Sequence, residues 1–197
     1  MASRRFSPHH HADFDRTEER QHRYRLVVLG VGVGVGVGDV VESIGGFLCD
    51  RARAGWDVRV FLDLPCAQPR DARPLTILGI AAQDLVTDSG PALRTLCRGG
   101  ALAVGADLLA RDAGIRDDVS RMVNQGLTEV TVWGHPGPGE SARGLDPAPH
   151  PLSAAARAFK AHALLAAGIE SEATEPLTAT ETLFRPRGQA FRRLYSI

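Results

Sequence analysis

The chain has 197 residues, which suits one compact domain with short extensions at its ends. Its 23 basic side chains are balanced by 23 acidic ones. This balance argues against a nucleic-acid or membrane-surface protein, because such proteins carry a large basic excess. No apolar run approaches the ~20 residues of a membrane span, and no secretion signal is found near the start. We therefore expect a cytoplasmic protein with no membrane partner.

The two ends of the chain differ in composition from its body. Residues 1–23 have almost no apolar residues, so we expect a disordered arm. We assign 24–184 to a single α/β domain. Residues 185–197 form a basic C-terminal extension that carries Arg185, Arg187, Arg192 and Arg193. This extension is a candidate contact surface for an oligomer or a protein partner.

The first elements of the domain follow a strand, helix, strand order. Residues 24–30 (YRLVVLG) predict a buried strand, and 57–63 (DVRVFLD) predict a second strand. Between them, apolar residues recur on one face of a helix that would start at Asp39 as its N-cap and end at Gly55. A right-handed crossover to a parallel strand is the expected connection.

The remaining elements continue this alternation. Residues 75–86 predict a strand, or a short helix followed by a strand, and 91–125 predict mainly helix with breaks at Gly99-Gly100 and Gly114. The later predictions are a strand at 127–133, a Gly/Pro loop at 134–151, a helix at 152–167 and a last, edge strand at 177–184. Together they predict a three-layer, Rossmann-like α/β fold with a mainly parallel sheet.

A repeated Gly-Val segment follows the first predicted strand. It would place Gly30, Gly32, Gly34, Gly36, Gly38 and Asp39 at the carboxyl edge of the sheet, where ligands of such folds bind. Asp63, at the end of the second strand, is positioned to accept ribose hydroxyls. The Gly-x-Gly-x-x-Gly fingerprint is absent in every frame, and Asp39 stands where a phosphate would sit. A ligand-binding loop and a repeat with no function both remain open.

Two adjacent glycines inside the predicted helix need a packing or functional reason, since each costs about 1 kcal/mol relative to alanine. The stretch 45–62 (GGFLCDRARAGWDVRVFL) resembles the segment after the metal motif of the PIG-L/LmbE-type N-acetylglucosaminyl deacetylases. Leu78-Gly79-Ile80 is similar to the Leu-Gly-Val that precedes the next strand of that family, and Val130-Thr131-Val132 is similar to its Pro-Asp-Val-Val strand. The resemblance covers roughly residues 24–168 and implies a Rossmann-like deacetylase scaffold.

The metal motif itself departs from that family. Its members bind zinc through His-Pro-Asp-Asp-Glu, whose first Asp is the general base, and through a later His. Here Gly36 stands at the His position, Gly38 at the base position and Asp39 at a ligand position. His150-Pro151 resembles the start of the later motif but lacks its second His. Asp39 with His150, aided by His135, remains a weak candidate for a rebuilt metal site.

The sequence predicts a non-catalytic protein that binds a nucleotide-like or sugar-like small molecule, or a regulatory protein, with no cofactor. The candidate ligand-binding residues are Gly30, Gly32, Gly34, Gly36, Gly38, Asp39, Asp63 and His135. A metal-dependent deacetylase with a rebuilt site and an interaction protein that uses its basic ends are the alternatives. Cys49, Cys66 and Cys97 are odd in number and widely spaced, which predicts free, buried thiols.

Overall fold

A computed structural model describes most of the chain between Tyr24 and Arg187. The described residues are 24–30, 36–62, 72–84, 97, 100–126, 128–136, 144–169 and 179–187. The predicted arm 1–23 and residues 188–197 of the predicted extension lie outside them. The strands are β1 Tyr24–Gly30, β2 Trp56–Leu62, β3 Ala81–Asp84, β4 Ala101–Gly105, β5 Glu129–Trp133, β6 Leu145–Pro151 and β7 Thr180–Pro186. The helices are α1 Val37–Arg53, α2 Arg73–Ile77, α4 Ala106–Arg111, α5 Ala113–Gln125 and α7 Ala154–Ala166.

Seven strands form one sheet in the order β3-β2-β1-β4-β5-β7-β6. The first five of these strands are mutually parallel. β7 is antiparallel to both β5 and β6. The predicted mainly parallel α/β sheet is therefore confirmed. Strand order reverses between β1 and β4, because the chain leaves β1 toward β2 on one side and β4 toward β5 on the other.

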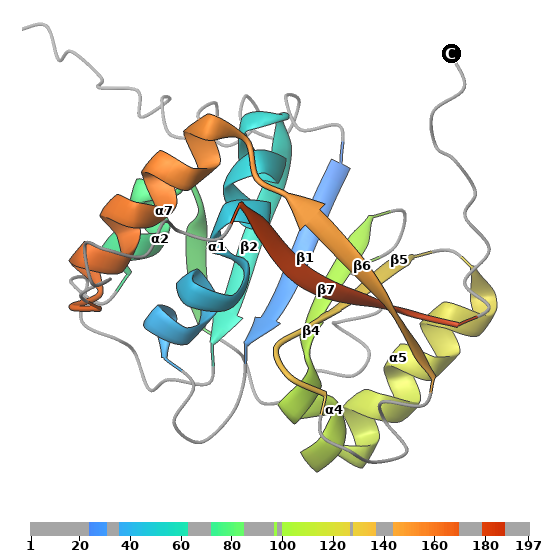
Figure 1. Ribbon diagram of the computed structural model, residues 1–197. Coiled ribbons are helices and arrows are strands. Elements are labelled where there is room, and N and C mark those ends of the chain that lie inside the picture. Colours follow the sequence, from blue (N-terminus) through green and yellow to red (C-terminus); the bar gives the residue numbers. More distant parts are fainter. Residues whose placement is uncertain are drawn as a thin grey trace, which may run out of the picture.

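Helices cover both faces of the sheet (Figure 1). Leu26 and Val28 of β1 point into a core cluster shared with α1, α2 and α7. Val27 and Leu29, which alternate with them, point into a second cluster shared with α4 and α5. All four side chains are at most 2% exposed, as expected for a central parallel strand covered on both sides.

α1 follows the predicted apolar pattern, and Val40, Val41, Ile44, Phe47 and Leu48 are all buried. It ends at Gly55, whose φ of 85° is the left-handed conformation that the sequence predicts there. Its start differs from the prediction. The N-cap is Gly36 and the helix begins at Val37, so Asp39 is the third helical residue and not the cap.

Two strands were not predicted, and one strand was predicted at the wrong position in the sheet. Residues 101–105 form the buried strand β4 and not a helix, and 145–151 form β6 inside the predicted Gly/Pro loop. β7 is the last strand in the described part of the chain, as predicted, but β6 takes the edge position. Residues 73–84 form a short helix followed by a strand, which was one of the two predicted alternatives.

β6 and β7 form an antiparallel ribbon that crosses in front of the other strands toward α1 (Figure 1). α7 connects these two strands and packs antiparallel to α1. Its N-cap Ser153 lies at Asp50, near the end of α1, and Ile169, just after α7, lies at Gly38 near the start of α1. No helix in the described part of the chain is long and apolar enough to cross a membrane.

Candidate functional site

The carboxyl edge of the parallel strands holds most of the predicted ligand-binding residues that the structure describes. Gly30 is the last residue of β1, and Gly36 and Gly38 lie at the start of α1. His135 lies at the same edge because it comes two residues after the end of β5. Gly32, Gly34 and Asp63 fall outside the described residues. The described part of this edge therefore offers mainly backbone and glycine.

Asp39 is already engaged by the backbone at the start of α1. Its Oδ2 accepts a hydrogen bond of 2.7 Å from the N–H of Gly36. A carboxylate in the first turn is also favoured by the positive end of the helix dipole. The arrangement accounts for an acid at this position through helix capping alone.

The space beside Gly38 is occupied by Ile169. A Cβ built on Gly38 would lie 2.9 Å from the Cδ1 of Ile169 and 3.8 Å from the Cβ of Ala167. Any side chain at position 38 would therefore displace the end of Ile169. Gly36 is less crowded, since its Cβ would meet only Asp39 Oδ2 at 3.7 Å and Gly38 N at 3.9 Å.

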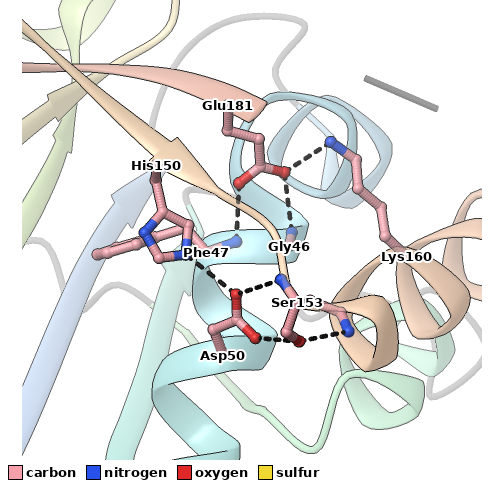
Figure 2. A network of polar contacts seen from close by, with 8 residues as sticks. Gly46, Phe47, Asp50, His150, Ser153, Lys160 and Glu181 are labelled. Atoms are coloured by element: carbon pink, nitrogen blue, oxygen red, sulfur yellow. Dashed lines mark hydrogen bonds and ion pairs between the residues drawn. The ribbon is translucent and has the colours of Figure 1, made fainter. Parts of the chain in front are cut away.

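His150 lies far from Asp39, which corrects the predicted pairing of these two residues in a metal site. The Nε2 of His150 is 3.0 Å from Oδ2 of Asp50, and the imidazole packs edge-on against Phe47 (Figure 2). Asp50 is eleven residues after Asp39 on α1, which corresponds to about 16 Å of helix. The structure therefore places His150 near the amino edge of the sheet and Asp39 at the carboxyl edge.

Asp50 connects α1 to the start of α7. Its Oδ1 accepts a 2.6 Å hydrogen bond from the hydroxyl of Ser153, which itself accepts from the N–H of Ala156 as the N-cap of α7 (Figure 2). Partial burial alone would raise the pKa of Asp50, but the hydrogen bonds from Ser153 and His150 outweigh it and lower that pKa. The serine bonds to the acid and not to the imidazole, so this group is not a nucleophilic triad.

The described residues do not fit a zinc centre of the kind that the family resemblance implies. Catalytic zinc needs three protein ligands and an open position. Within the described ranges no group of three His, Cys, Asp or Glu side chains could hold a metal ion. Of the residues aligned with the metal motif only Asp39 has a ligating side chain, and its Oδ2 accepts the N–H of Gly36.

A buried ion pair, which the sequence analysis missed, lies where the β6–β7 ribbon meets α1. The Nζ of Lys160 is 2.6 Å from Oε1 of Glu181, and these side chains are 5% and 2% exposed. Glu181 also accepts from the N–H groups of Gly46 at 2.9 Å and Phe47 at 2.7 Å, while Lys160 donates to the carbonyl of Glu42 (Figure 2). Lys160 is the only lysine in the chain, and that signal was available in the sequence.

The contact of Glu181 with α1 requires glycine at position 46. A Cβ at Gly46 would lie 2.5 and 2.6 Å from the two Cδ atoms of Leu152, and 3.0 Å from Oε1 of Glu181. Gly45 is less restricted, because its Cβ would meet Val41 Cγ1 at 3.2 Å and Leu78 Cδ1 at 3.4 Å. The double glycine thus has a packing reason, as the sequence analysis expects.

Trp133, the last residue of β5, is 5% exposed and carries an unpaired polar atom. Its indole Nε1 is fully buried and has no hydrogen-bond partner in the described structure. Gly105, at the end of β4, lies beside the ring, since a Cβ there would be 3.4 Å from Cζ2 and 3.6 Å from Cε2. Buried tryptophan N–H groups usually have a partner, so this one is unusual.

Two further features lie away from the carboxyl edge. Cys49 and Cys97 are free and buried as predicted, while Cys66 falls outside the described residues. Burial raises the pKa of the Cys97 thiol to about 12. A shallow hollow of about 200 Å³ opens between α1, α2 and α7 near the amino edge, beside Arg53 and Phe159.

Comparison with solved structures identifies the fold. No family model and no curated protein matches the sequence. A triple mutant of the deacetylase Orf2 of the teicoplanin biosynthetic pathway matches with a TM-score of 0.56 at 13% identity, over 82% of this chain and 97% of that one. The zinc-inhibited form of teicoplanin deacetylase Orf2 matches with a TM-score of 0.56 at 13% identity, over 81% of this chain and 97% of that one.

The conserved protein TT1542 from Thermus thermophilus is also similar, with a TM-score of 0.53 at 14% identity over 88% of this chain and 98% of that one. These neighbours are LmbE/PIG-L family members. The resemblance carried by residues 45–62 is therefore confirmed at the level of the fold.

Proposed function

We propose that this chain is a small-molecule-binding protein that keeps the LmbE-like scaffold and does not hydrolyse its ligand through a zinc centre. The observation that carries the proposal is the contact between Gly38 and Ile169. By the family resemblance, position 38 would hold the general base. Here glycine has no group that takes a proton, and a Cβ at this position would lie 2.9 Å from Cδ1 of Ile169, which would have to shift to admit a side chain.

The fold supports a site at the carboxyl edge of the sheet. In open parallel sheets ligands bind beyond the carboxyl ends of the strands, at the point where strand order reverses. That point lies between β1 and β4 in this sheet. Gly36 leaves the start of α1 open for close approach, because a Cβ there would meet only Asp39 Oδ2 at 3.7 Å and Gly38 N at 3.9 Å, and this suits a nucleotide-like or sugar-like ligand.

A metal-dependent deacetylase is the second candidate, because the solved structures that share the fold include deacetylases. Such an activity would need ligands other than the His150 and Asp39 pair. The third candidate, an interaction protein with basic ends, receives less support from the described residues. Arg185 and Arg187 lie near Glu129 and Asp146 of the domain itself.

One experiment separates the three candidates. Purified protein is analysed for zinc, assayed for acetate release from N-acetylglucosamine conjugates, and titrated with N-acetylglucosamine while its melting temperature is followed. We expect no stoichiometric zinc, no acetate release and a saturable rise in melting temperature. Near-unit zinc with chelator-sensitive hydrolysis would establish the deacetylase. If the protein showed neither hydrolysis nor stabilisation by the ligand, the interaction protein would be the remaining candidate.

A matched set of variants tests the role of position 38. G36H/G38D restores the aligned His and base, and I169A/G36H/G38D also removes the side chain that fills the space. We expect zinc binding to improve only when Ile169 is truncated. I169A alone is the control and should bind no more zinc than the wild type. Equal zinc binding with and without Ile169 would show that this contact does not restrict the site.

A further inference from the structure

The indole N–H of Trp133, at the end of β5, is a hydrogen-bond donor without an acceptor one strand away from the point where strand order reverses. The residue is 5% exposed, and Nε1 is buried and unpaired in the described structure. An unsatisfied buried donor loses its hydrogen bonds to water and gains none in return. Phenylalanine would supply a buried aromatic ring without that penalty, so the presence of a buried donor here calls for an explanation.

The surroundings of the indole place its N–H side near the ligand edge. Cε2, the ring carbon bonded to Nε1, lies 3.6 Å from the Cβ position of Gly105 at the carboxyl end of β4. That same Cβ position is 3.8 Å from the carbonyl oxygen of Leu29 at the end of β1. Because Gly105 has no side chain, the indole can lie across the ends of these two strands.

The start of α1 supplies further donors at this edge. Val37, in the first turn, belongs to the same core cluster as Trp133. The N–H groups of Val37, Gly38 and Asp39 have no acceptor inside the helix, because they belong to its first turn. They add backbone donors to this edge, and α1 is long enough, at 17 residues, to carry a dipole.

The charged side chains at this edge restrict the charge of the ligand that can bind there. The carboxylate of Asp39 lies in the first turn of α1 and already accepts the N–H of Gly36. Neither lysine nor arginine occurs at 36–39, at 105 or at 133–135. The carboxylate of Asp39 would repel a doubly charged phosphate more strongly than a singly charged carboxylate, and it would not repel a neutral carbonyl oxygen.

We propose that the indole N–H of Trp133 donates a hydrogen bond to a carbonyl or carboxylate oxygen of the ligand bound between the ends of β1 and β4. This deepens the proposed function and rests on it. Nε1 has no solvent-exposed surface, so the ligand reaches it only when side chains around the indole shift. The donor then selects ligands that present a neutral or singly charged oxygen.

The two tryptophans make a direct test practical, since Trp56 and Trp133 are the only indoles in the chain. In ¹⁵N-labelled protein, W56F leaves a single indole N–H signal. We expect this signal to move downfield and saturate with acetate and with N-acetylglucosamine, and to stay in place with inorganic phosphate. The backbone amides of Gly36 and Gly38 report binding independently of Trp133.

The outcomes separate this inference from the proposed function. Movement of the Gly36 and Gly38 amides with a stationary indole signal would keep the binding site and overturn the role of Trp133. An equal shift with phosphate would overturn the selection by charge. Absence of every shift would overturn both proposals.

W133F provides a second readout that a purely structural tryptophan would not give. It should keep the fold but weaken acetate binding at least about tenfold, because it removes a hydrogen bond to a charged acceptor. W56F is the matched control and should bind acetate as the wild type does. Unchanged acetate affinity in W133F would overturn the inference.

Discussion

The carboxylate of Glu181 on β7 accepts a 2.9 Å hydrogen bond from the backbone N–H of Gly46 in the middle of α1, 135 residues earlier in the chain. A helix N–H normally bonds within its own helix, so a side chain reaching it from elsewhere requires close approach. The absence of a Cβ at Gly46 permits that approach. The contact fixes the β6–β7 ribbon on α1.

Removal of Lys160 should destabilise the protein strongly. K160M leaves Glu181 as a buried carboxylate without its cation, and breaking such a pair costs about 3–5 kcal/mol. The free energy of unfolding from urea denaturation measures the loss. R157M is the matched control on the exposed part of the same helix and should change stability by less than about 0.5 kcal/mol.

The double variant K160M/E181Q measures the coupling energy between Lys160 and Glu181. Since both charges are removed together, its cost should be smaller than the sum of the two single costs, which makes the coupling energy large. Additive costs would mean that Lys160 and Glu181 act independently.

G46A should destabilise the fold although alanine is the better helix former. The added Cβ would come within 2.6 Å of Leu152, and overpacking of this kind costs about 1–3 kcal/mol against a propensity gain of about 1 kcal/mol. A denaturant melt gives the sign. G45A, whose Cβ meets its neighbours at 3.2 Å or more, should cost less.

Truncation of the obstructing side chain provides the control for G46A. In the L152A background the same glycine substitution should become neutral or stabilising. Destabilisation of equal size in both backgrounds would show that Leu152 is not the cause.

Stability should depend on pH through Asp50. Because its folded pKa is lowered, the carboxylate contributes stability above its unfolded pKa near 3.8, and this contribution is lost as the pH falls through the folded pKa. D50N should therefore lower the free energy of unfolding at pH 6, by about 1–3 kcal/mol, and the difference from the wild type should shrink between pH 4 and pH 2. If the difference in free energy of unfolding between D50N and the wild type did not change with pH, ionisation of Asp50 would not be its origin.

The buried thiols should be inert in the folded protein. Burial raises the pKa of Cys97 to about 12 and also raises that of Cys49, so neither forms a thiolate at pH 8. Alkylation with iodoacetamide, followed by peptide mass spectrometry, should modify these residues only after denaturation. Rapid native alkylation of Cys97 would contradict the packing of the second core cluster.

Sequence patterns predicted the elements whose local signal is strong. β1 carries a continuous apolar run, and the apolar face of α1 has the helical period, so both were found nearly to the residue. β4 was missed because Ala101–Gly105 is short, fully buried and built from residues that also suit a helix. β6 was missed because three of its seven residues are prolines, which only an edge strand tolerates.

The candidate site was less accessible from sequence because its contacts are distant in the chain. The glycines at 36 and 38 indicated the loss of the metal motif, but only the structure places Ile169 beside Gly38. His150 was chosen as a candidate ligand because His150-Pro151 matches the start of a family motif. In the structure His150 lies on β6 and contacts Asp50 on α1. The single lysine at 160 could have been singled out by its rarity among arginines.

The β6–β7 ribbon joins the rest of the sheet at one paired position, Val132 opposite Phe184. Its attachment therefore depends heavily on the contacts around Lys160, which is 4% exposed. Apart from the α-amine, the ε-amine of Lys160 is the sole primary amine that an acylating reagent can find in this sequence. Acylation of Lys160 in the native protein therefore requires that α7 or the ribbon separate from α1, and the acylation rate measures how often that opening occurs.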